Sequence, residues 1–533
     1  MTEGYVCLIL HAHLPFIRHP EHPWFLEERW LFEAINDCYL PLLDVLDGLA
    51  RDGVRTRLTL SLTPTLMAGL DDEHLRDRFA AHLRDLVELA RKEEDRTRHS
   101  EYHHLAQFYA HRFSRHLASY EGRGRDLVSA FARHQDEGRL EILASAATHA
   151  YLPLLGSEQA ARAQVITGVE AYRRRLGRSP RGFWLPECGY RPGLDHFLAE
   201  AGVEYVILET HGVTHAVPRP RYGYLAPITM PAGVKAFGRD PESSKQVWSA
   251  DEGYPGDPWY RDYYRDIGFD LDYDYVRPHL GPPGQRLCTG FKYHRITHRR
   301  SEHKELYQPH AAWERAVVHA GNFVFNRAKQ VEWHRGHMDR LPFLVCPYDA
   351  ELFGHWWFEG PWWLDQVVRM LQNHPVLEPA TCGDYLDRYP KNQRCQPSLS
   401  SWGCRGYSEV WLEGSNDWLH RHLHVAARRM EELARHFERP SYLERRALNQ
   451  AARELMLAQA SDWAFILKTG TFPGYARRRF KGHIAGFLEL YHGLKRGTLD
   501  EARVVTLENQ TPLLHHVDYQ VFRPGEAARA AGS

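Results

Sequence analysis

Residues 182–187 read GFWLPE, a short apolar run that ends on the carboxylate of Glu187. Six further β-rich runs lie along the chain, at residues 5–10, 58–62, 140–146, 204–208, 234–237 and 341–346. Helical patterns separate many of them, at residues 31–51, 75–91, 108–134 and 158–176. Short buried strands that alternate with helices are typical of a parallel sheet covered by helices. Seven such strands favour an α/β fold with a closed or nearly closed (β/α) barrel over an open sheet.

The pattern changes after residue 380, where few strand signals remain. Residues 418–437, 441–466 and 476–494 carry apolar side chains at helical i, i+3, i+4 spacing. The segment 391–401, rich in Pro, Ser and Gln, has the composition of a junction. We therefore predict a catalytic barrel over residues 1–380, with inserted helical and loop segments, and a helical C-terminal domain over residues 381–533.

Composition narrows the class of protein. Of 533 residues, 43% are hydrophobic and 25% charged, which is typical of a globular chain with an ample core. The net charge of −1 provides no basic field for nucleic acid or anionic lipid. No apolar run is long enough for a membrane span. The eight cysteines form no CxxC pair, which favours a reducing compartment and predicts a cytoplasmic protein. The oligomeric state is left open.

Polar residues gather directly after the predicted strands. The loops at the carboxyl ends of parallel barrel strands converge, so residues at these positions share one site. These residues are His11, His13, His149, Glu187, Glu209, His211 and Asp349. One such residue would mean little, but a set at equivalent positions indicates an active-site ring.

Two carboxylates in this ring follow apolar, aromatic runs. Glu187 ends residues 182–187, and Asp349 ends residues 341–349. Two carboxyl groups in unequal environments are what glycoside chemistry requires, one ionised and one protonated. Two structural alternatives remain open. Asp349 could be the N-cap of a helix that starts with Ala350-Glu351-Leu352, and Glu187 could be a structural carboxylate.

Histidines and tryptophans provide further candidates. His11 and His13 lie on one face of an extended segment, which suits zinc ligation with a third ligand or hydrogen bonds to sugar hydroxyls. Because an isolated pair of histidines is more often structural, we do not favour the metal role and predict no metal. Indole faces stack on the apolar faces of sugar rings, although many tryptophans belong to protein cores. The candidates of this kind are Trp248, Trp356, Trp357, Trp362, Trp363, Trp402, Trp411, Trp418 and Trp463.

These motifs resemble glycoside hydrolase family 57, within the group of α-glucan branching enzymes and related α-amylases. The resemblance covers nearly the whole chain. The segments that carry it are His11-Ala-His13-Leu-Pro15, Ala147-Thr148-His149, Trp184-Leu-Pro-Glu187, Gln246-Val-Trp-Ser-Ala-Asp251, Gly253-Tyr-Pro-Gly256, Tyr348-Asp349-Ala-Glu-Leu-Phe-Gly-His355-Trp356-Trp357, Ser401-Trp402-Gly403 and Ala460-Ser461-Asp462-Trp463.

The resemblance implies a (β/α)7 distorted TIM-like barrel, an all-α C-terminal domain and a retaining double displacement on α-1,4-glucans such as amylose, glycogen or starch. It implies no metal and no cofactor. Glu187 matches the nucleophile and Asp349 the general acid/base. The implied substrate contacts are His11, His13, His149, Arg239, Trp248, Gly256, His355, Trp357, Trp402, Trp411 and Asp462. Because Trp402 and Asp462 fall in the helical domain, that domain is expected to close over the barrel mouth.

One region departs from the branching enzymes of the family. These carry a long mobile loop between the fifth and sixth strands, with a tyrosine that shields the covalent intermediate. Here residues 210–233 are short and rich in proline, and neither Tyr222 nor Tyr224 aligns clearly. An α-1,4-glucan branching enzyme is the leading hypothesis, and an α-amylase-like hydrolase is the alternative. A metal-dependent barrel hydrolase, built on His11, His13 and a carboxylate, and a non-catalytic glucan-binding protein are less favoured.

Overall fold

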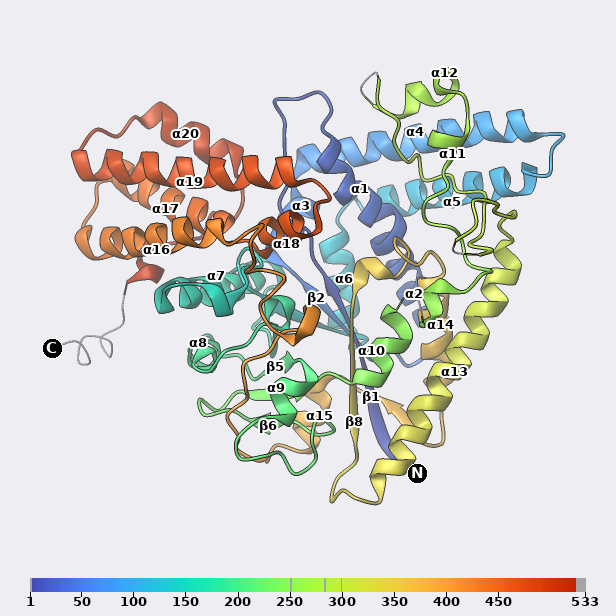
Figure 1. Ribbon diagram of the computed structural model, residues 1–533, viewed down its shortest axis with the longest axis horizontal. Coiled ribbons are helices and arrows are strands. Elements are labelled where there is room, and N and C mark those ends of the chain that lie inside the picture. Colours follow the sequence, from blue (N-terminus) through green and yellow to red (C-terminus); the bar gives the residue numbers. More distant parts are fainter. Residues whose placement is uncertain (1, 250–251, 282–283, 299, 524–533) are drawn as a thin grey trace.

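The computed structural model describes residues 2–249, 252–281, 284–298 and 300–523 (Figure 1). Ala250 and Asp251 of the Gln246–Asp251 motif lie outside these residues. Nine strands form the sheet: β1 (Gly4–Ala12), β2 (Leu58–Leu62), β3 (Leu140–Ser145), β4 (Gly182–Trp184), β5 (Tyr205–Leu208), β6 (Ile228–Thr229), β7 (Lys235–Gly238), β8 (Phe343–Asp349) and β9 (Leu377–Pro379). The seven predicted strands correspond to β1–β5, β7 and β8.

The sheet closes into a barrel. Its order is β6-β7-β5-β4-β3-β2-β1-β8, and β1, β2, β3, β4, β5, β7 and β8 run parallel. The ring is completed just after β7, where Arg239 forms a parallel bridge to Val345 of β8. The backbone N–H of Asp240 donates to the carbonyl of Val345 at 2.7 Å. The predicted (β/α)7 barrel is therefore confirmed, with β6 and β9 as short additions at its rim.

The strands read as continuous apolar runs because both of their faces are buried. In β1, Tyr5, Cys7 and Ile9 belong to a compact cluster inside the barrel, together with Trp184 and Phe343. The alternate residues of β1 belong to the larger core between the strands and the surrounding helices. Successive side chains of a strand point to opposite faces, so a strand buried on both faces needs apolar residues at every position.

Helices surround the barrel and continue beyond it. The barrel part contains α1 (Arg29–Ala34), α2 (Leu40–Arg51), α3 (Pro64–Asp71), α4 (Glu73–Thr97), α5 (His103–Gly122), α6 (Leu127–Asp136), α7 (Glu158–Leu176), α8 (Leu194–Glu200), α9 (Thr210–Thr214), α10 (Pro241–Trp248), α11 (Ile267–Asp270), α12 (Tyr273–Val276), α13 (Pro309–Arg335), α14 (Gly360–Leu371) and α15 (Cys382–Arg388). The helices α4 and α5 form an antiparallel pair that extends away from the barrel beside α11 and α12 (Figure 1).

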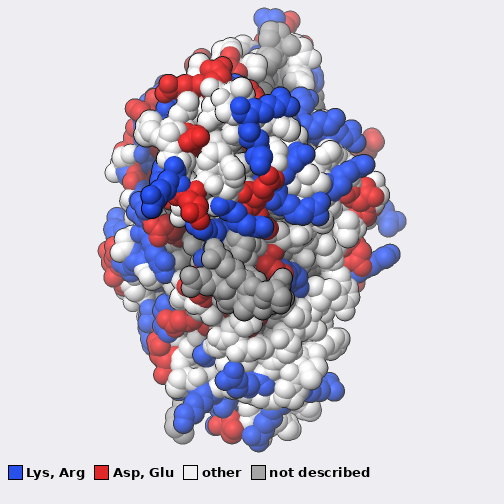
Figure 2. Space-filling view, turned by 90° about the vertical axis from the view of Figure 1, so that its left-hand side faces the viewer, with Lys and Arg blue, Asp and Glu red and all other residues white. Residues whose placement is uncertain are grey.

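The C-terminal helices form a group of their own on the left of Figure 1. They are α16 (Trp418–His436), α17 (Tyr442–Ala458), α18 (Ser461–Thr469), α19 (Pro473–Arg496) and α20 (Glu501–Gln510). Helix α17 packs against α16, α19 and α20, and α18 packs on α19. Figure 2 views the molecule from the side of these helices, and basic and acidic side chains are mixed on that surface. None of the described helices is both long and apolar enough to cross a bilayer.

Two predicted helices are each divided in the structure. Residues 108–134 fall on α5 and α6, because Gly124 and Arg125 adopt positive φ values of 62° and 60° between them. Residues 441–466 fall on α17 and α18, which are separated at Gln459 and Ala460. The second break brings the first residues of α18 to the carboxyl ends of the barrel strands.

Candidate active site

The carboxyl ends of the barrel strands carry the predicted site residues. His11 of β1 is the register partner of Asp349 in β8 on one side and of Ser61 in β2 on the other. Glu187 lies three residues after β4. Because all seven barrel strands are parallel, these ends meet at one mouth of the barrel.

The backbone at Glu187 is unusual for a residue with a side chain. Glu187 has φ of 62° and ψ of 23°, and the next residue, Cys188, has φ of 49°. This left-handed conformation is unfavourable for L-residues and is found preferentially where surrounding contacts impose it, often at active sites. Two backbone bonds hold the turn: Cys188 N–H donates to the carbonyl of Leu185 at 2.9 Å, and Trp402 N–H donates to the carbonyl of Glu187 at 3.0 Å.

Each carboxylate oxygen of Glu187 receives a hydrogen bond from the C-terminal third of the chain. The Trp402 Nε1–H donates to Oε2 at 2.8 Å, and the Ser461 Oγ–H donates to Oε1 at 3.3 Å. Burial raises the pKa of Glu187, while the Trp402 bond, the charge of His13 and the Ser461 bond oppose that rise. The site therefore contains donors that stabilise the ionised form of a buried carboxyl.

Asp349 is in a different environment. It occupies the N-cap position of the short 3-10 helix Ala350–Leu352, but its side chain makes no capping hydrogen bond, so capping is not its role. Burial raises the pKa of Asp349 well above its usual value, and the nearby charges of Glu351 and Glu187 raise it further, against the opposing charge of Arg239. When neighbouring carboxyl groups have different pKa values, the one with the higher pKa can act as an acid while the other is ionised and can act as a nucleophile.

The three predicted histidines are linked to one another and to Glu187. Nε2 of His11 lies 2.9 Å from Nε2 of His149, and Nδ1 of His149 lies 2.9 Å from Oγ of Ser461. His149 has a positive φ of 54°, a second left-handed residue at the mouth. The ring of His11 stacks on Trp184 with centroids 4.6 Å apart. Burial lowers the pKa values of His11 and His149 well below the usual range, so both rings are neutral at physiological pH.

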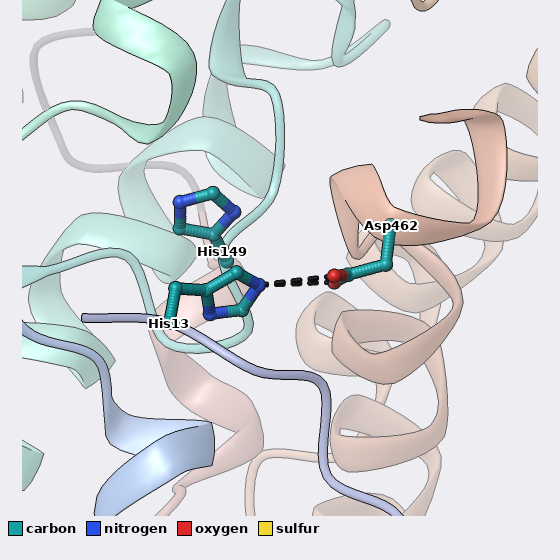
Figure 3. Close-up of side chains that lie close together, drawn as sticks. All are labelled: His13, His149 and Asp462. Carbon is teal, nitrogen blue, oxygen red and sulfur yellow. Dashed lines mark hydrogen bonds and ion pairs between the residues drawn. The ribbon is translucent and has the colours of Figure 1, made fainter. Parts of the chain in front are cut away.

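His13 joins the barrel to the helical domain. Its Nε2 lies 3.1 Å and 3.2 Å from the two carboxylate oxygens of Asp462, in the first turn of α18 (Figure 3). Its Nδ1 lies 3.0 Å from Oγ1 of Thr63. The structure therefore brings Asp462 and Trp402 to the barrel mouth, as the resemblance implied for the helical domain.

The histidine cluster does not have the geometry of a metal centre. The ligand atoms of His13, His149 and Asp462 lie within 4.8 Å of one another. However, the rings of His13 and His149 stack with centroids 3.7 Å apart and planes 17° apart. A metal binds in the plane of each imidazole at about 2.0–2.1 Å, and two rings stacked face to face do not direct their lone pairs to one point. Both nitrogens of His149 also have protein partners, His11 and Ser461.

Arg239 connects the closing strand to Trp402, the hydrogen-bond partner of Glu187. Its Nη1–H donates to Oε2 of Glu209 at 3.0 Å, and its Nε–H donates to Oγ of Ser244 at 2.7 Å. The guanidinium lies over the ring of Trp402, 5.4 Å from the centroid. We infer that Arg239 supports the indole and limits the rise in the pKa of Asp349, in addition to any contact with substrate.

Two of the tryptophans among the implied substrate contacts are buried. Trp357 is 1% exposed and lies among Tyr260, Phe353 and Trp363, so its assignment as a substrate contact is corrected to a core residue. Trp411 is 2% exposed, and its ring stacks on Tyr151 with centroids 4.3 Å apart. One face of that indole is therefore occupied by protein.

The remaining implied contacts lie on the segment between β7 and α13 or face it. His355 Nδ1 is 3.3 Å from Oδ2 of Asp37, and its Nε2 is 3.3 Å from the hydroxyl of Tyr263. Gly256 ends the short 3-10 helix Tyr254–Gly256. Trp248 is exposed at the last position of α10. Their contact with substrate stays a prediction.

Several residues of the site were not found from the sequence. Ser461 contacts both Glu187 and His149. It could have been predicted from its position next to Asp462 in the family motif at residues 460–463. Glu351 lies two residues after Asp349. It accepts hydrogen bonds from the His13 backbone N–H at 3.2 Å and from the Tyr39 hydroxyl. Ser61 and Thr63, at the end of β2, follow the same strand-end rule as the histidines they contact.

Comparison with known proteins places this geometry in a family. The model of glycosyl hydrolase family 57 matches residues 7–396. The chain belongs to glycosyl hydrolase family 57. A second model, described as the C-terminal part of 1,4-alpha-glucan branching enzyme, matches residues 422–522. This family member is 33% identical to a 1,4-alpha-glucan branching enzyme of Thermococcus kodakarensis, over 93% of this chain and 74% of the relative.

Two solved structures share the whole fold of this family 57 chain. The alpha-amylase AmyC of Thermotoga maritima is 41% identical with a TM-score of 0.92, over 98% of this chain and 100% of that one. A family 57 branching enzyme of Pyrococcus horikoshii is 32% identical with a TM-score of 0.88, over 98% of each chain. The relatives thus include both of the activities that the sequence left open.

The hydrogen bond from Trp402 gives a first prediction. Trp402→Phe keeps the ring beside Trp184 but removes the donor to Glu187. We expect kcat on maltooligosaccharides to fall by about 10- to 100-fold, since a hydrogen bond to a charged group contributes about 1.5–3 kcal/mol. Trp363→Phe is the matched control, because Nε1 of that buried indole has no partner among the described residues. A similar loss of kcat in both variants would contradict a role for the indole N–H.

Proposed function

We propose that this chain is a retaining α-1,4-glucan branching enzyme. It would cleave an α-1,4 bond of an amylose- or glycogen-like chain and transfer the released end to a 6-hydroxyl, which creates an α-1,6 branch. The observation that carries this proposal is the match of residues 422–522 to the branching-enzyme C-terminal model. The same helical domain supplies Ser461 and Asp462 to the candidate site.

In the first step, we assign Glu187 as the nucleophile. Its carboxylate would attack the anomeric carbon while Asp349 donates its proton to the leaving glycosidic oxygen, so the C–O bond of the glucan breaks as the ester bond forms. Trp402 and Ser461 support this role, because they stabilise the charge on Glu187 and fix the plane of its carboxylate.

In the second step, the same two carboxyls would exchange roles. Formation of the ester removes the charge of Glu187, which is one cause of the raised pKa of Asp349. The pKa of Asp349 therefore falls at the moment when it must act as a base. Asp349 would then take the proton of an acceptor hydroxyl, the hydroxyl oxygen would bond to the anomeric carbon, and Glu187 would leave as a carboxylate.

An α-amylase-like hydrolase is the second candidate, in which water replaces the sugar hydroxyl. The 41% identity to the alpha-amylase AmyC favours it. The segment 210–233 also favours a hydrolase, because neither of its tyrosines is directed to the carboxylate pair. The hydroxyl of Tyr224 accepts from Gln330 of α13, and Tyr222 lies beside the guanidinium groups of Arg221 and Arg340, so both tyrosines are engaged outside the carboxylate pair.

We also propose a reducing, cytoplasmic location. All eight cysteine thiols are free, and six of them are buried. A protein that folds in an oxidising compartment rarely keeps this many unpaired cysteines.

Linkage analysis of the products tests the proposed function. The protein is incubated with amylose, and α-1,6 linkages and new reducing ends are counted over the same period. A branching enzyme forms one α-1,6 linkage for each α-1,4 bond that it transfers, so linkages should exceed new reducing ends several-fold. Reducing ends that accumulate without α-1,6 linkages would identify a hydrolase instead. Glu187→Gln is the control, and neither product should form.

A further inference from the structure

A continuous chain of hydrogen bonds runs from the wall of the barrel to the candidate nucleophile. Oγ of Ser61 lies 3.1 Å from Nδ1 of His11, and Nε2 of His11 lies 2.9 Å from Nε2 of His149. Nδ1 of His149 lies 2.9 Å from Oγ of Ser461, which lies 3.3 Å from Oε1 of Glu187. All four residues behind Glu187 are buried.

With Glu187 ionised, as its proposed role requires, one set of proton directions satisfies every bond in the chain. Ionised Glu187 only accepts, so the single O–H of Ser461 points to it, and Oγ of Ser461 must accept from Nδ1–H of His149. A neutral imidazole carries one N–H, which leaves Nε2 of His149 as an acceptor for Nε2–H of His11. Nδ1 of His11 then accepts from the hydroxyl of Ser61. Burial keeps both rings neutral, since it lowers their pKa values.

We propose that Ser461 is a positioning residue for the nucleophile: its hydroxyl, oriented by the His149–His11–Ser61 chain, holds Oε1 of Glu187 in line with the anomeric carbon. The inference rests on the proposed role of Glu187 and adds to it a specific function for the first residue of α18. The donor comes from the helical domain, so docking of that domain completes the nucleophile.

The two oxygens of Glu187 have different partners. Oε2 is held by the indole N–H at 2.8 Å, and Oε1 by the longer Ser461 bond at 3.3 Å. We assign Oε1, the oxygen that Ser461 positions, as the one that attacks the anomeric carbon. In the ester, Oε1 carries the sugar and loses its charge, while Oε2 becomes the carbonyl oxygen and keeps its bond to Trp402.

The side chain of Ser461 can be removed without undocking the helix. The Ser461 backbone N–H donates separately to the carbonyl of His149 at 3.0 Å, and Ala150 forms a bridge to Ala460. His13 and Asp462 provide a further link between the domains. A change in turnover on loss of the hydroxyl would therefore report on Glu187 and not on the interface.

The experiment compares Ser461→Ala with Ser400→Ala. Both serines are buried, and Oγ of Ser400 has no hydrogen-bond partner among the described residues. We expect Ser461→Ala to lose about tenfold in kcat with little change in KM, and Ser400→Ala to keep both values, since a hydrogen bond to a charged group is lost in the first variant alone. Equal kcat values for the two variants would overturn the proposal.

The pH dependence of kcat/KM separates a positioning role from a structural one, because loss of a structural residue would not shift it. A donor favours the charged carboxylate, so its loss raises the pKa of Glu187 and shifts the acid limb of kcat/KM to higher pH. The other groups that act on Glu187 or lie beside it are His13, His149, Asp349 and Asp462, with Tyr151 and Cys188, and all are retained in the variant. An acid limb that coincides with that of Ser400→Ala would contradict the inference.

A neutron crystal structure of the unmodified protein tests the proton directions directly. We expect deuterium on Nδ1 of His149 and on Nε2 of His11. Deuterium on Nε2 of His149 would mean that Ser461 donates to the ring and not to Glu187, and the proposal would be abandoned. Failure of the proposed role of Glu187 is distinguishable, because Glu187→Gln would then retain activity, whereas failure of this inference alone leaves that variant inactive and Ser461→Ala normal. Failure of the branching proposal appears separately, as reducing ends without α-1,6 linkages in the linkage analysis.

Discussion

Glu187→Gln is expected to lower kcat on α-1,4-glucans by about 10⁴-fold or more, with the fold intact, because the attacking charge is lost. The amide keeps the size of the side chain and can still accept from Trp402 and interact with Ser461. Purified variant and unmodified protein are compared for kcat and thermal stability. Glu378→Gln is the control, since Glu378 lies in β9 beside the amino end of β1, away from the barrel mouth, and is paired with Arg388. Near-normal turnover of Glu187→Gln would remove Glu187 from the mechanism.

The left-handed backbone at Glu187 permits a sharper version of this test. Glycine adopts a φ of 62° without strain, so Glu187→Gly removes the side chain and leaves the turn undisturbed. Azide can then enter the vacant space and attack an α-maltosyl fluoride, which yields a β-maltosyl azide. Formation of that product in Glu187→Gly places the lost nucleophile on the β face of the sugar. If azide has no effect although the protein is folded, the assignment of Glu187 fails.

Asp349→Asn is expected to lower kcat on amylose by about 10²–10⁴-fold, the range of general acid–base catalysis. The leaving alkoxide of a glucan needs a proton, whereas fluoride does not. The first step on α-maltosyl fluoride should therefore be slowed far less than the reaction on amylose. A pre-steady-state burst of fluoride on this substrate measures the difference. Equal losses on both substrates would show that Asp349 is not the proton donor.

The pH dependence of activity provides a second test of Asp349 as the proton donor. Asp349 must be protonated for the first step, so activity is lost as pH rises through its raised pKa, and the basic limb should disappear in Asp349→Asn. Glu351→Gln removes a charge that raises this pKa, which should move the basic limb to lower pH. The other charged groups that act on Asp349 are Glu187 and Arg239. A basic limb unchanged in both variants would assign it to another residue.

The barrel could be predicted because its strands are buried on both faces. Val6 and Cys7, for example, belong to different core clusters, but both are apolar. A strand of this kind forms a continuous apolar run, which can be recognised from the sequence alone. The closing bridge at Arg239 and the break before Ser461 could not be predicted in this way. Both depend on hydrogen bonds between distant segments, Asp240 N–H to Val345 and Ser461 N–H to His149.

The site was predictable in position more than in detail. The rule that parallel strands end at one edge located His11, Glu187 and Asp349, and the family motifs added Trp402 and Asp462. What each side chain does depends on its neighbours in space. Trp402 was expected to stack on sugar, but its N–H binds a carboxylate 215 positions away in the chain. Trp357 has an aromatic context like that of a sugar platform, yet its neighbours bury it.

Glucosyl transfer through a covalent ester on Glu187 is tested most directly by trapping that ester. A fluorinated maltosyl fluoride, which forms such an ester quickly and releases it slowly, labels the nucleophile for mass spectrometry of peptic fragments. We predict one added maltosyl unit on the peptide that contains Glu187, absent in Glu187→Gln and retained in Asp349→Asn. A label on Asp349 or another carboxylate, or inactivation with no label, would contradict the account.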